Sequence, residues 1–269
     1  RSARDRARVC VDLLTLFLLG AWTLHAQAFV PFTGAAAIVA SSGTNHSCAV
    51  VGGAAKCWGD NSGGQLGDGS TTPALTPIQV SGLASGVIAV AVGNLHSCAI
   101  TTGGAVKCWG TNTNGQLGDG TQTNRLTPVA VSGLASGVTA LVAGMGHTCA
   151  LTSGGAMKCW GRNDWGQIGD NSVAQRLAPV NVSGLGSGVA AIAAGQFHTC
   201  AATSTGLVKC WGDNANGQLG DNSITQRLTP VNVSGIASGA TVVAAGNAHT
   251  CAVVSGGAKC WGLNGNGQL

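Results

Sequence analysis

The sequence predicts an all-β fold, a β-propeller of four-stranded blades, from three observations. One constellation of residues occurs five times, for example as "GMGHTCALTSGGAMKCWGRNDWGQIGDN" and as "GQFHTCAATSTGLVKCWGDNANGQLGDN". The copies recur every 51 residues or nearly so, a period that is typical of propellers and solenoids. Each unit carries a Pro and many Gly and contains no amphipathic run of three helical turns, which argues against helical repeats.

The unit from Pro179 to Thr229 gives the expected elements in order. It predicts strands at "PVNV" (179–182), "VAAIAA" (189–194), "HTCAAT" (198–203) and "LVKCWG" (207–212), separated by Gly-rich turns. Four strands per unit make one propeller blade, so we assign these four strands to the same blade. The central hairpins of the five units are then expected at 46–58, 96–109, 147–160, 198–211 and 249–261.

The repeat carries a recognisable motif. Trp-Gly, Gly-Gln-Leu-Gly, Pro and Gly-x-x-His recur in register, as in "WGDNANGQLGD", "TPVNVSG" and "VVAAGNAHTCAV". This pattern resembles the regulator of chromosome condensation repeat family, in a bacterial secreted form, over roughly residues 37 to 269. The resemblance implies a seven-bladed propeller that is a monomer at full length. We therefore expect residues 29–269 to be an incomplete propeller with about five of seven blades, and the missing blades to lie beyond Leu269.

The first 28 residues have the pattern of a signal peptide. A basic start, "RSARDRAR", precedes the apolar run "VDLLTLFLLGAW" and the small-x-small stretch Ala26-Gln27-Ala28. The alternative, a membrane anchor, needs ~20 apolar residues, and this run is shorter. We expect cleavage near Phe29, a secreted or periplasmic protein, and no membrane contact after cleavage.

Charge argues against nucleic acid as a partner. Beyond residue 28 there are nine Lys or Arg against seven Asp, so the expected mature chain is nearly neutral. A protein that grips phosphates generally presents a strongly basic face.

Two cysteines flank a tight turn in each unit, and counting outward from "TSGG" places Cys149 opposite Cys159 on adjacent strands. Opposed strand residues lie close enough to be bridged, and export leads to an oxidising compartment. Zinc binding is one alternative, but each unit offers at most three ligands. A catalytic cysteine is another, but a sulfur in a disulfide cannot act as a nucleophile. We therefore predict no metal or cofactor and five disulfides: Cys48–Cys57, Cys98–Cys108, Cys149–Cys159, Cys200–Cys210 and Cys251–Cys260.

Other recurrent side chains have simple structural interpretations. We expect the histidine of each unit to form hydrogen bonds between neighbouring blades. The Trp that follows the second Cys of each unit is expected to pack blade against blade: Trp58, Trp109, Trp160, Trp211 and Trp261. The Asp after each "GQLG" or "GQIG" is expected to stabilise a turn.

Two short loops vary from copy to copy, after Gly in Gly-x-x-His and after Trp-Gly. Antiparallel strand order places both loops at the same end of every blade, where propellers and other repeat proteins present binding surfaces. Aromatic, Arg and Met side chains dominate interface cores, although exposed loops also vary by drift. The candidate residues of a partner-binding rim are Leu95, Met145, Arg162, Asp164, Trp165, Gln196 and Phe197.

These features predict a secreted or periplasmic, non-enzymatic scaffold that binds an unidentified protein. The family that this sequence resembles includes extracellular bacterial propellers that inhibit β-lactamases. One alternative is a guanine-nucleotide exchange or chromatin regulator like the eukaryotic namesake. A glycan-acting enzyme is a further alternative, but the chain has no Glu, and Asp164 is the one Asp beyond residue 28 without a counterpart in another copy.

Overall fold

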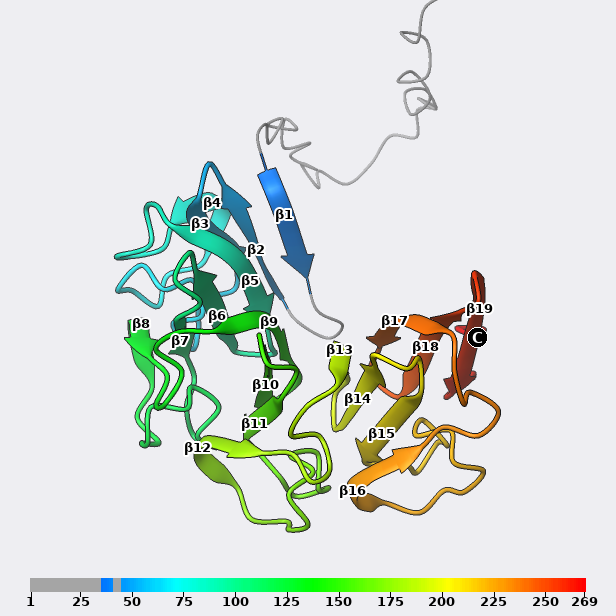
Figure 1. The fold of residues 1–269 in the computed structure, drawn as a ribbon. Coiled ribbons are helices and arrows are strands. Elements are labelled where there is room, and N and C mark those ends of the chain that lie inside the picture. Colours follow the sequence, from blue (N-terminus) through cyan, green and yellow to red (C-terminus); the bar gives the residue numbers. More distant parts are fainter. Residues whose placement is uncertain (1–34, 41–44) are drawn as a thin grey trace, which may run out of the picture. The chain divides into compact units, whose positions relative to one another are not determined.

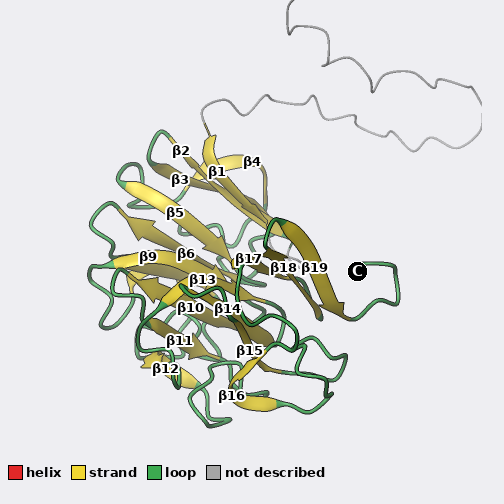
Figure 2. Cartoon of the chain, turned by 45° about the vertical axis from the view of Figure 1, so that its right-hand side comes forward, coloured by secondary structure: helices red, strands yellow, loops and turns green. Residues whose placement is uncertain are grey.

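The computed structural model describes residues 35–40 and 45–269, and the predicted signal peptide, residues 1–28, lies outside this part of the chain. The described residues form nineteen strands joined by turns (Figures 1 and 2). The first blade consists of β1 (Ala35–Ala40), β2 (His46–Val51), β3 (Ala54–Gly59) and β4 (Ala74–Gln79). The second consists of β5 (Val87–Val92), β6 (His96–Thr101), β7 (Val106–Gly110) and β8 (Arg125–Ala130).

The remaining strands repeat this arrangement. The third blade consists of β9 (Val138–Ala143), β10 (His147–Thr152), β11 (Met157–Gly161) and β12 (Arg176–Asn181). The fourth consists of β13 (Val189–Ala194), β14 (His198–Thr203), β15 (Val208–Gly212) and β16 (Arg227–Asn232). The fifth has three described strands, β17 (Ala240–Ala245), β18 (His249–Val254) and β19 (Gly257–Gly262).

Each blade is an antiparallel meander in which the strands pair in chain order. The first strands of successive blades, β1, β5, β9, β13 and β17, pack on one another, and the fourth strands lie at the periphery (Figure 1). This arrangement confirms the prediction of an all-β propeller with four-stranded blades.

The assignment of the "PVNV" strand was wrong. The sequence unit placed it in one blade with residues 189–212, whereas the structure starts this strand, β12, at Arg176 and pairs it with β11 of the preceding blade. Cys159 lies opposite Val180, and Lys158 lies opposite Asn181. The long loop after β11 brings the chain back to its own sheet, and the short turn after β12 then crosses to the next blade. The sequence repeat is therefore one strand out of phase with the structural blade.

The cores lie between successive blades. Trp211 of the fourth blade is fully buried and packs in a cluster with Met157, Leu185 and Ile192, which belong to the third blade, the crossing turn and β13. Trp160 occupies the equivalent cluster one blade earlier, and Trp109 occupies the one two blades earlier. The predicted packing role of these tryptophans is confirmed, and an indole contributes a large apolar area at each site.

A chain of hydrogen bonds joins each blade to the next. Between the third and fourth blades, His147 Nε2 lies 3.0 Å from Thr199 Oγ1, and the Thr199 hydroxyl donates to the carbonyl oxygen of Gln167 at 2.8 Å. The indole N–H of Trp211 donates to the same carbonyl at 3.0 Å. Equivalent histidine contacts are His46–Ser97, His96–Thr148 and His198–Thr250. The predicted interblade role of the histidines is confirmed, and we call this arrangement the interblade joint.

The joint fixes the protonation of its histidine. The hydroxyl proton of Thr199 is used on Gln167, so His147 Nε2 must be the donor to Thr199 and Nδ1 carries no proton. His147 Nδ1 is buried without a hydrogen-bond partner, so a second proton there would have no acceptor. Burial, with a smaller contribution from neighbouring His96 and His198, lowers the pKa of His147 to about 3. The imidazole is therefore neutral at physiological pH.

The glycine of Gly-x-x-His is required by close approach. A Cβ atom on Gly144 would collide with Cε1 of His147 and with the carbonyl oxygen of Gly195. The repeated spacing of Gly and His thus reflects the space that the imidazole occupies in the joint.

The structure brings ten cysteines into the five pairs named from the sequence, with S–S distances of 2.08 to 2.10 Å. Each pair joins directly opposed residues of the two central strands, with Cα atoms 4.0 to 4.1 Å apart. The cysteines of the first four blades are fully buried, whereas Cys260 is exposed on β19, beside a cavity of about 400 Å³ lined partly by Trp261.

Candidate functional site

The two variable loops of each blade lie side by side, as predicted. The backbone N–H of Arg162 donates to the carbonyl of Gly146 at 2.8 Å, and that of Asp213 donates to Phe197 at 2.9 Å. Equivalent bonds tie Asp60 to Asn45, Thr111 to Leu95 and Leu263 to Ala248. The variable positions therefore form one rim at a common end of the described blades.

Four of the predicted rim residues form a compact group. The rings of Trp165 and Phe197 have centroids 6.4 Å apart, and the Arg162 guanidinium lies 4.9 Å from the Phe197 centroid. Arg162 Nε also pairs with Asp164 Oδ2 at 2.5 Å. Trp165 is 39% exposed, and 58% of the Asp164 side chain is exposed. We call Arg162, Asp164, Trp165 and Phe197 the rim cluster.

Met145 and Gln196 connect the third and fourth blades at the same rim. The Met145 N–H donates to the Gln196 carbonyl at 3.3 Å, and Gln196 Nε2 lies 3.5 Å from the Met145 sulfur. The Gln196 N–H in turn donates to the carbonyl of Asn247 in the fifth blade, a contact that sequence reasoning did not single out. Leu95 lies in the second blade, where its carbonyl accepts from Thr111, and is therefore not part of the rim cluster.

Buried polar bonds hold the loop that carries Arg162, Asp164 and Trp165. The fully buried Asn163 accepts from the Ile168 N–H and donates to Asp170 Oδ1 and to two loop carbonyls. Asp170 Oδ1 accepts from the Ser172 N–H, which confirms its predicted turn role, and Oδ2 pairs with Arg176 at 2.6 Å. Buried hydrogen bonds thus fix the conformation of the loop that carries three of the four rim-cluster residues.

Gln167 forms the floor of this loop, and sequence reasoning missed it. Its Oε1 accepts from the Trp165 N–H at 2.9 Å, but its Nε2 is buried without a hydrogen-bond partner. In the first and fourth blades the equivalent Nε2 atoms of Gln65 and Gln218 each donate to an aspartate at 2.8 Å. Arg162 occupies that aspartate's position in the third blade. The available signal was the replacement of Asp by Arg five residues before an unchanged Gln.

The aspartate in the first blade is well stabilised as an anion. Burial raises the pKa of Asp60, but hydrogen bonds from Ser62 and Gln65 outweigh this effect and leave the pKa below its usual value. The glutamine Nε2 is thus part of a site suited to a carboxylate.

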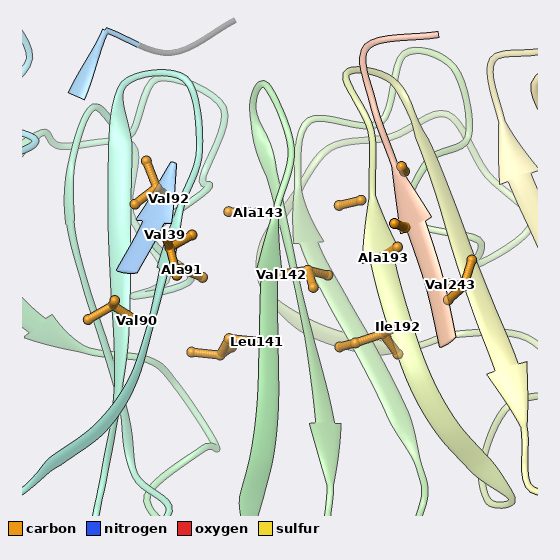
Figure 3. Close-up of a pocket in the computed structure, with 13 residues that line it drawn as sticks. Val39, Val90, Ala91, Val92, Leu141, Val142, Ala143, Ile192, Ala193 and Val243 are labelled. Carbon is orange, nitrogen blue, oxygen red and sulfur yellow. The ribbon is translucent and has the colours of Figure 1, made fainter. Parts of the chain in front are cut away.

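A second concave surface lies between the first strands of the blades. This cavity of about 330 Å³ is lined by Val, Ala, Leu and Ile from β1, β5, β9, β13 and β17, including Val39, Leu141 and Ile192 (Figure 3). These side chains offer apolar contact and no group that can transfer a proton. Across residues 35–40 and 45–269, no group of three or more His, Cys, Asp or Glu is arranged to hold a metal ion. Within the same ranges, no helix has the length and apolar character needed to cross a membrane.

Comparison with known families decides the classification. A model of the RCC1-like domain matches residues 23–269. The chain belongs to the RCC1-like domain family. The repeated Trp, His and Gly-Gln-Leu-Gly positions of this RCC1-like chain are those that build the core clusters and the interblade joint.

Curated relatives of the RCC1-like chain are longer proteins. The probable E3 ubiquitin-protein ligase HERC4 of Homo sapiens is 38% identical over 184 residues, which cover 66% of this chain and 17% of HERC4. The ultraviolet-B receptor UVR8 of Arabidopsis thaliana is 33% identical over 222 residues, which cover 80% of this chain and 50% of UVR8. The chain spans half or less of the length of these relatives.

Solved structures share the RCC1-like fold. Yeast RCC1 (Prp20), in a complex with Kap60, is 25% identical, with a TM-score of 0.71 over 82% of this chain and 54% of that chain. Human WBSCR16 is 23% identical, with a TM-score of 0.74 over 83% of this chain and 58% of that chain, a likeness of fold alone.

Proposed function

We propose that this chain is an exported, non-enzymatic scaffold that binds a protein partner through the rim cluster. The observation that carries the proposal is the partly exposed pair of Trp165 and Phe197, flanked by Arg162 and held on a rigid loop. Aromatic and Arg side chains at the centre of an interface provide most binding energy, especially when the surface is preorganised.

Export is supported by the cysteines and by the N-terminal sequence. Five cysteine pairs at bonding distance are expected in oxidising compartments and are rare in the cytosol. The basic start, apolar run and small-x-small stretch of residues 1–28 favour the same location.

A protein is the favoured class of partner. The near-neutral charge beyond residue 28 does not favour nucleic acid. Yeast RCC1, a structural relative, was solved bound to Kap60, another protein, which supports a binding role for propellers of this family. A scaffold of this kind needs no cofactor and, at full length, acts as a monomer.

Replacement of the two aromatic residues by their counterparts in other repeats is expected to weaken partner capture. Trp165→Asn copies Asn114 and Asn216, and Phe197→Ala copies Ala248, so both changes introduce residues that the same loop accepts elsewhere. Each should reduce binding by about 2 kcal/mol or more if its aromatic ring is a hot spot, with the melting temperature little changed. Pull-down from periplasm or culture fluid, quantified against wild type, measures the effect.

The matched control lies at the other end of the blades. Ser204→Ala changes an exposed turn residue between β14 and β15 and should leave capture unchanged. Equal capture by wild type, both rim variants and the turn variant would mean that rim variation is drift, and the proposal would fail.

A further inference from the structure

The first and fourth blades hold a carboxylate at the same place in the loop after Trp-Gly. Asp213 Oδ1 accepts from the Ala215 N–H at 3.1 Å, and its Oδ2 accepts from Gln218 Nε2 at 2.8 Å. Asp60 repeats this pattern with the Ser62 N–H at 3.1 Å and Gln65 Nε2 at 2.8 Å. A backbone N–H and a glutamine Nε2 therefore form a two-pronged donor site for a carboxylate.

The third blade keeps the donors but lacks the carboxylate. Arg162 stands where Asp60 and Asp213 stand, and a guanidinium cannot accept a hydrogen bond. Gln167 cannot turn its amide over without losing the bond from the Trp165 N–H to Oε1. Its Nε2 consequently remains buried and without a partner, and the whole residue has 0% exposure. Buried donors of this kind are rare in folded proteins and call for a physical explanation.

We propose that the loop of the third blade is a receptor for a carboxylate of the protein partner, which takes the position that Asp60 and Asp213 fill in their own blades. Gln167 Nε2 and the Asp164 N–H donate to it, and Arg162 neutralises its charge. This inference rests on the proposed function, and it assigns an acidic group to the partner that the rim cluster binds.

Gln167 is fully buried, so a carboxylate can reach its Nε2 only if neighbouring side chains move, and Arg162 holds the sequence position that the carboxylate would take. Arg162 is held by its ion pair with Asp164, in which the Arg162 side chain is 30% exposed and the Asp164 side chain 58% exposed. Exposed pairs of this kind contribute little to stability. An incoming carboxylate can therefore compete with Asp164 for Arg162. Trp165 and Phe197 lie beside this position and provide apolar contact for the residues that flank the acidic group.

A double substitution that copies the fourth blade separates binding from folding. Arg162→Asp with Asp164→Ala reproduces the sequence Asp213-Asn214-Ala215, so the new carboxylate should accept from Gln167 Nε2. We expect the melting temperature to rise by about 2–4 °C, because a buried donor gains its acceptor. The same variant should lose the proposed binding, because its own carboxylate fills the site. A melting temperature that is unchanged or lower would overturn the claim that this loop preserves a carboxylate position.

Two random decapeptide libraries provide the binding probe. In the first, both peptide ends are blocked, and in the second, the C-terminal carboxylate is free. Selection on wild type should enrich Asp or Glu in the first library if the group is a side chain, or succeed only with the second if it is a C-terminal carboxylate. Enriched peptides should bind the Arg162→Asp, Asp164→Ala variant at least tenfold more weakly. Their amide or alcohol analogues, in which a neutral group replaces the carboxylate, should lose affinity to the same extent.

The other outcomes distinguish this inference from the proposed function. Peptides without a required carboxylate that still depend on Trp165 would overturn the carboxylate receptor and leave the rim as the binding surface. Peptides that bind wild type, Trp165→Asn and the double variant equally would overturn both. A selection that yields no binder dependent on Arg162 also overturns the receptor.

Discussion

Acidification from pH 7 to pH 5 is expected to reduce the free energy of unfolding steeply. The pKa of an unperturbed histidine is 6.5. Burial lowers the pKa of His46 and His198 to about 4, and that of His96 and His147 to about 3. The unfolded chain therefore binds more protons than the folded chain below pH 6.5. The free energy of unfolding that the neutral histidines contribute is fully present above pH 6.5 and is lost as the pH falls towards 4. The loss is roughly 1.4 kcal/mol per pH unit for each histidine, or about 5 kcal/mol per pH unit for all four.

Urea denaturation at half-unit steps between pH 7 and pH 4.5 measures this slope. Over that range the carboxyl groups contribute little, because the shifted aspartates, such as Asp170, have pKa values below their usual 3.8. His147→Gln keeps an N–H that can reach Thr199 and removes one titrating group, so it should reduce the slope by about one quarter. A free energy of unfolding that is constant from pH 7 to pH 5 would contradict the neutral joint.

Opening the disulfides is expected to have the second large effect. On the chain-entropy model, closing a loop of about ten residues contributes roughly 2.5–3 kcal/mol per bridge. Cys149→Ala with Cys159→Ala should therefore lower the free energy of unfolding by about that amount. Complete reduction should lower the melting temperature far more, because distant bridges act almost independently. Calorimetry of the oxidised, reduced and double-alanine forms provides the measurement.

The order of reduction gives an internal control. Cys260 is exposed, while the cysteines of the first four blades are fully buried, so graded reduction followed by alkylation should release Cys251 and Cys260 first. Mass mapping of unreduced, exported protein should find every pair bridged within its own blade. Free thiols at Cys149 and Cys159, or stoichiometric zinc, would contradict the disulfide assignment.

The fold was predictable from the sequence wherever a short-range pattern determines the structure. The register of Cys149 and Cys159 follows from a tight turn between two strands, and the spacing of Gly144 and His147 marks a joint that recurs every blade. The placement of β12 was not predictable in this way. A strand that follows a long loop pairs with whichever sheet it returns to, and nothing in "PVNV" distinguishes the preceding blade from the next.

The candidate site was predictable in part for a related reason. Variation between copies pointed to Arg162, Trp165 and Phe197, because these residues, which the structure leaves exposed or partly exposed, differ from their counterparts. Gln167 is the same in every repeat and looks like scaffold. Its role depends on a hydrogen bond that it fails to make, and this becomes visible only when its Nε2 is compared with those of Gln65 and Gln218.

Gln167 also takes part in the interblade joint between the third and fourth blades, which couples the rim to the stability of the contact between these two blades. Its carbonyl oxygen accepts hydrogen bonds from Thr199 and Trp211 of the fourth blade. Its side chain accepts from the Trp165 N–H beneath the rim cluster. The rim cluster spans this seam, because Trp165 belongs to the third blade and Phe197 to the fourth, so a partner that contacts both rings must release one of them before the blades can separate. A bound partner would therefore act as a clamp across this seam and would raise the free energy of separating the third blade from the fourth by an amount set by its concentration and affinity.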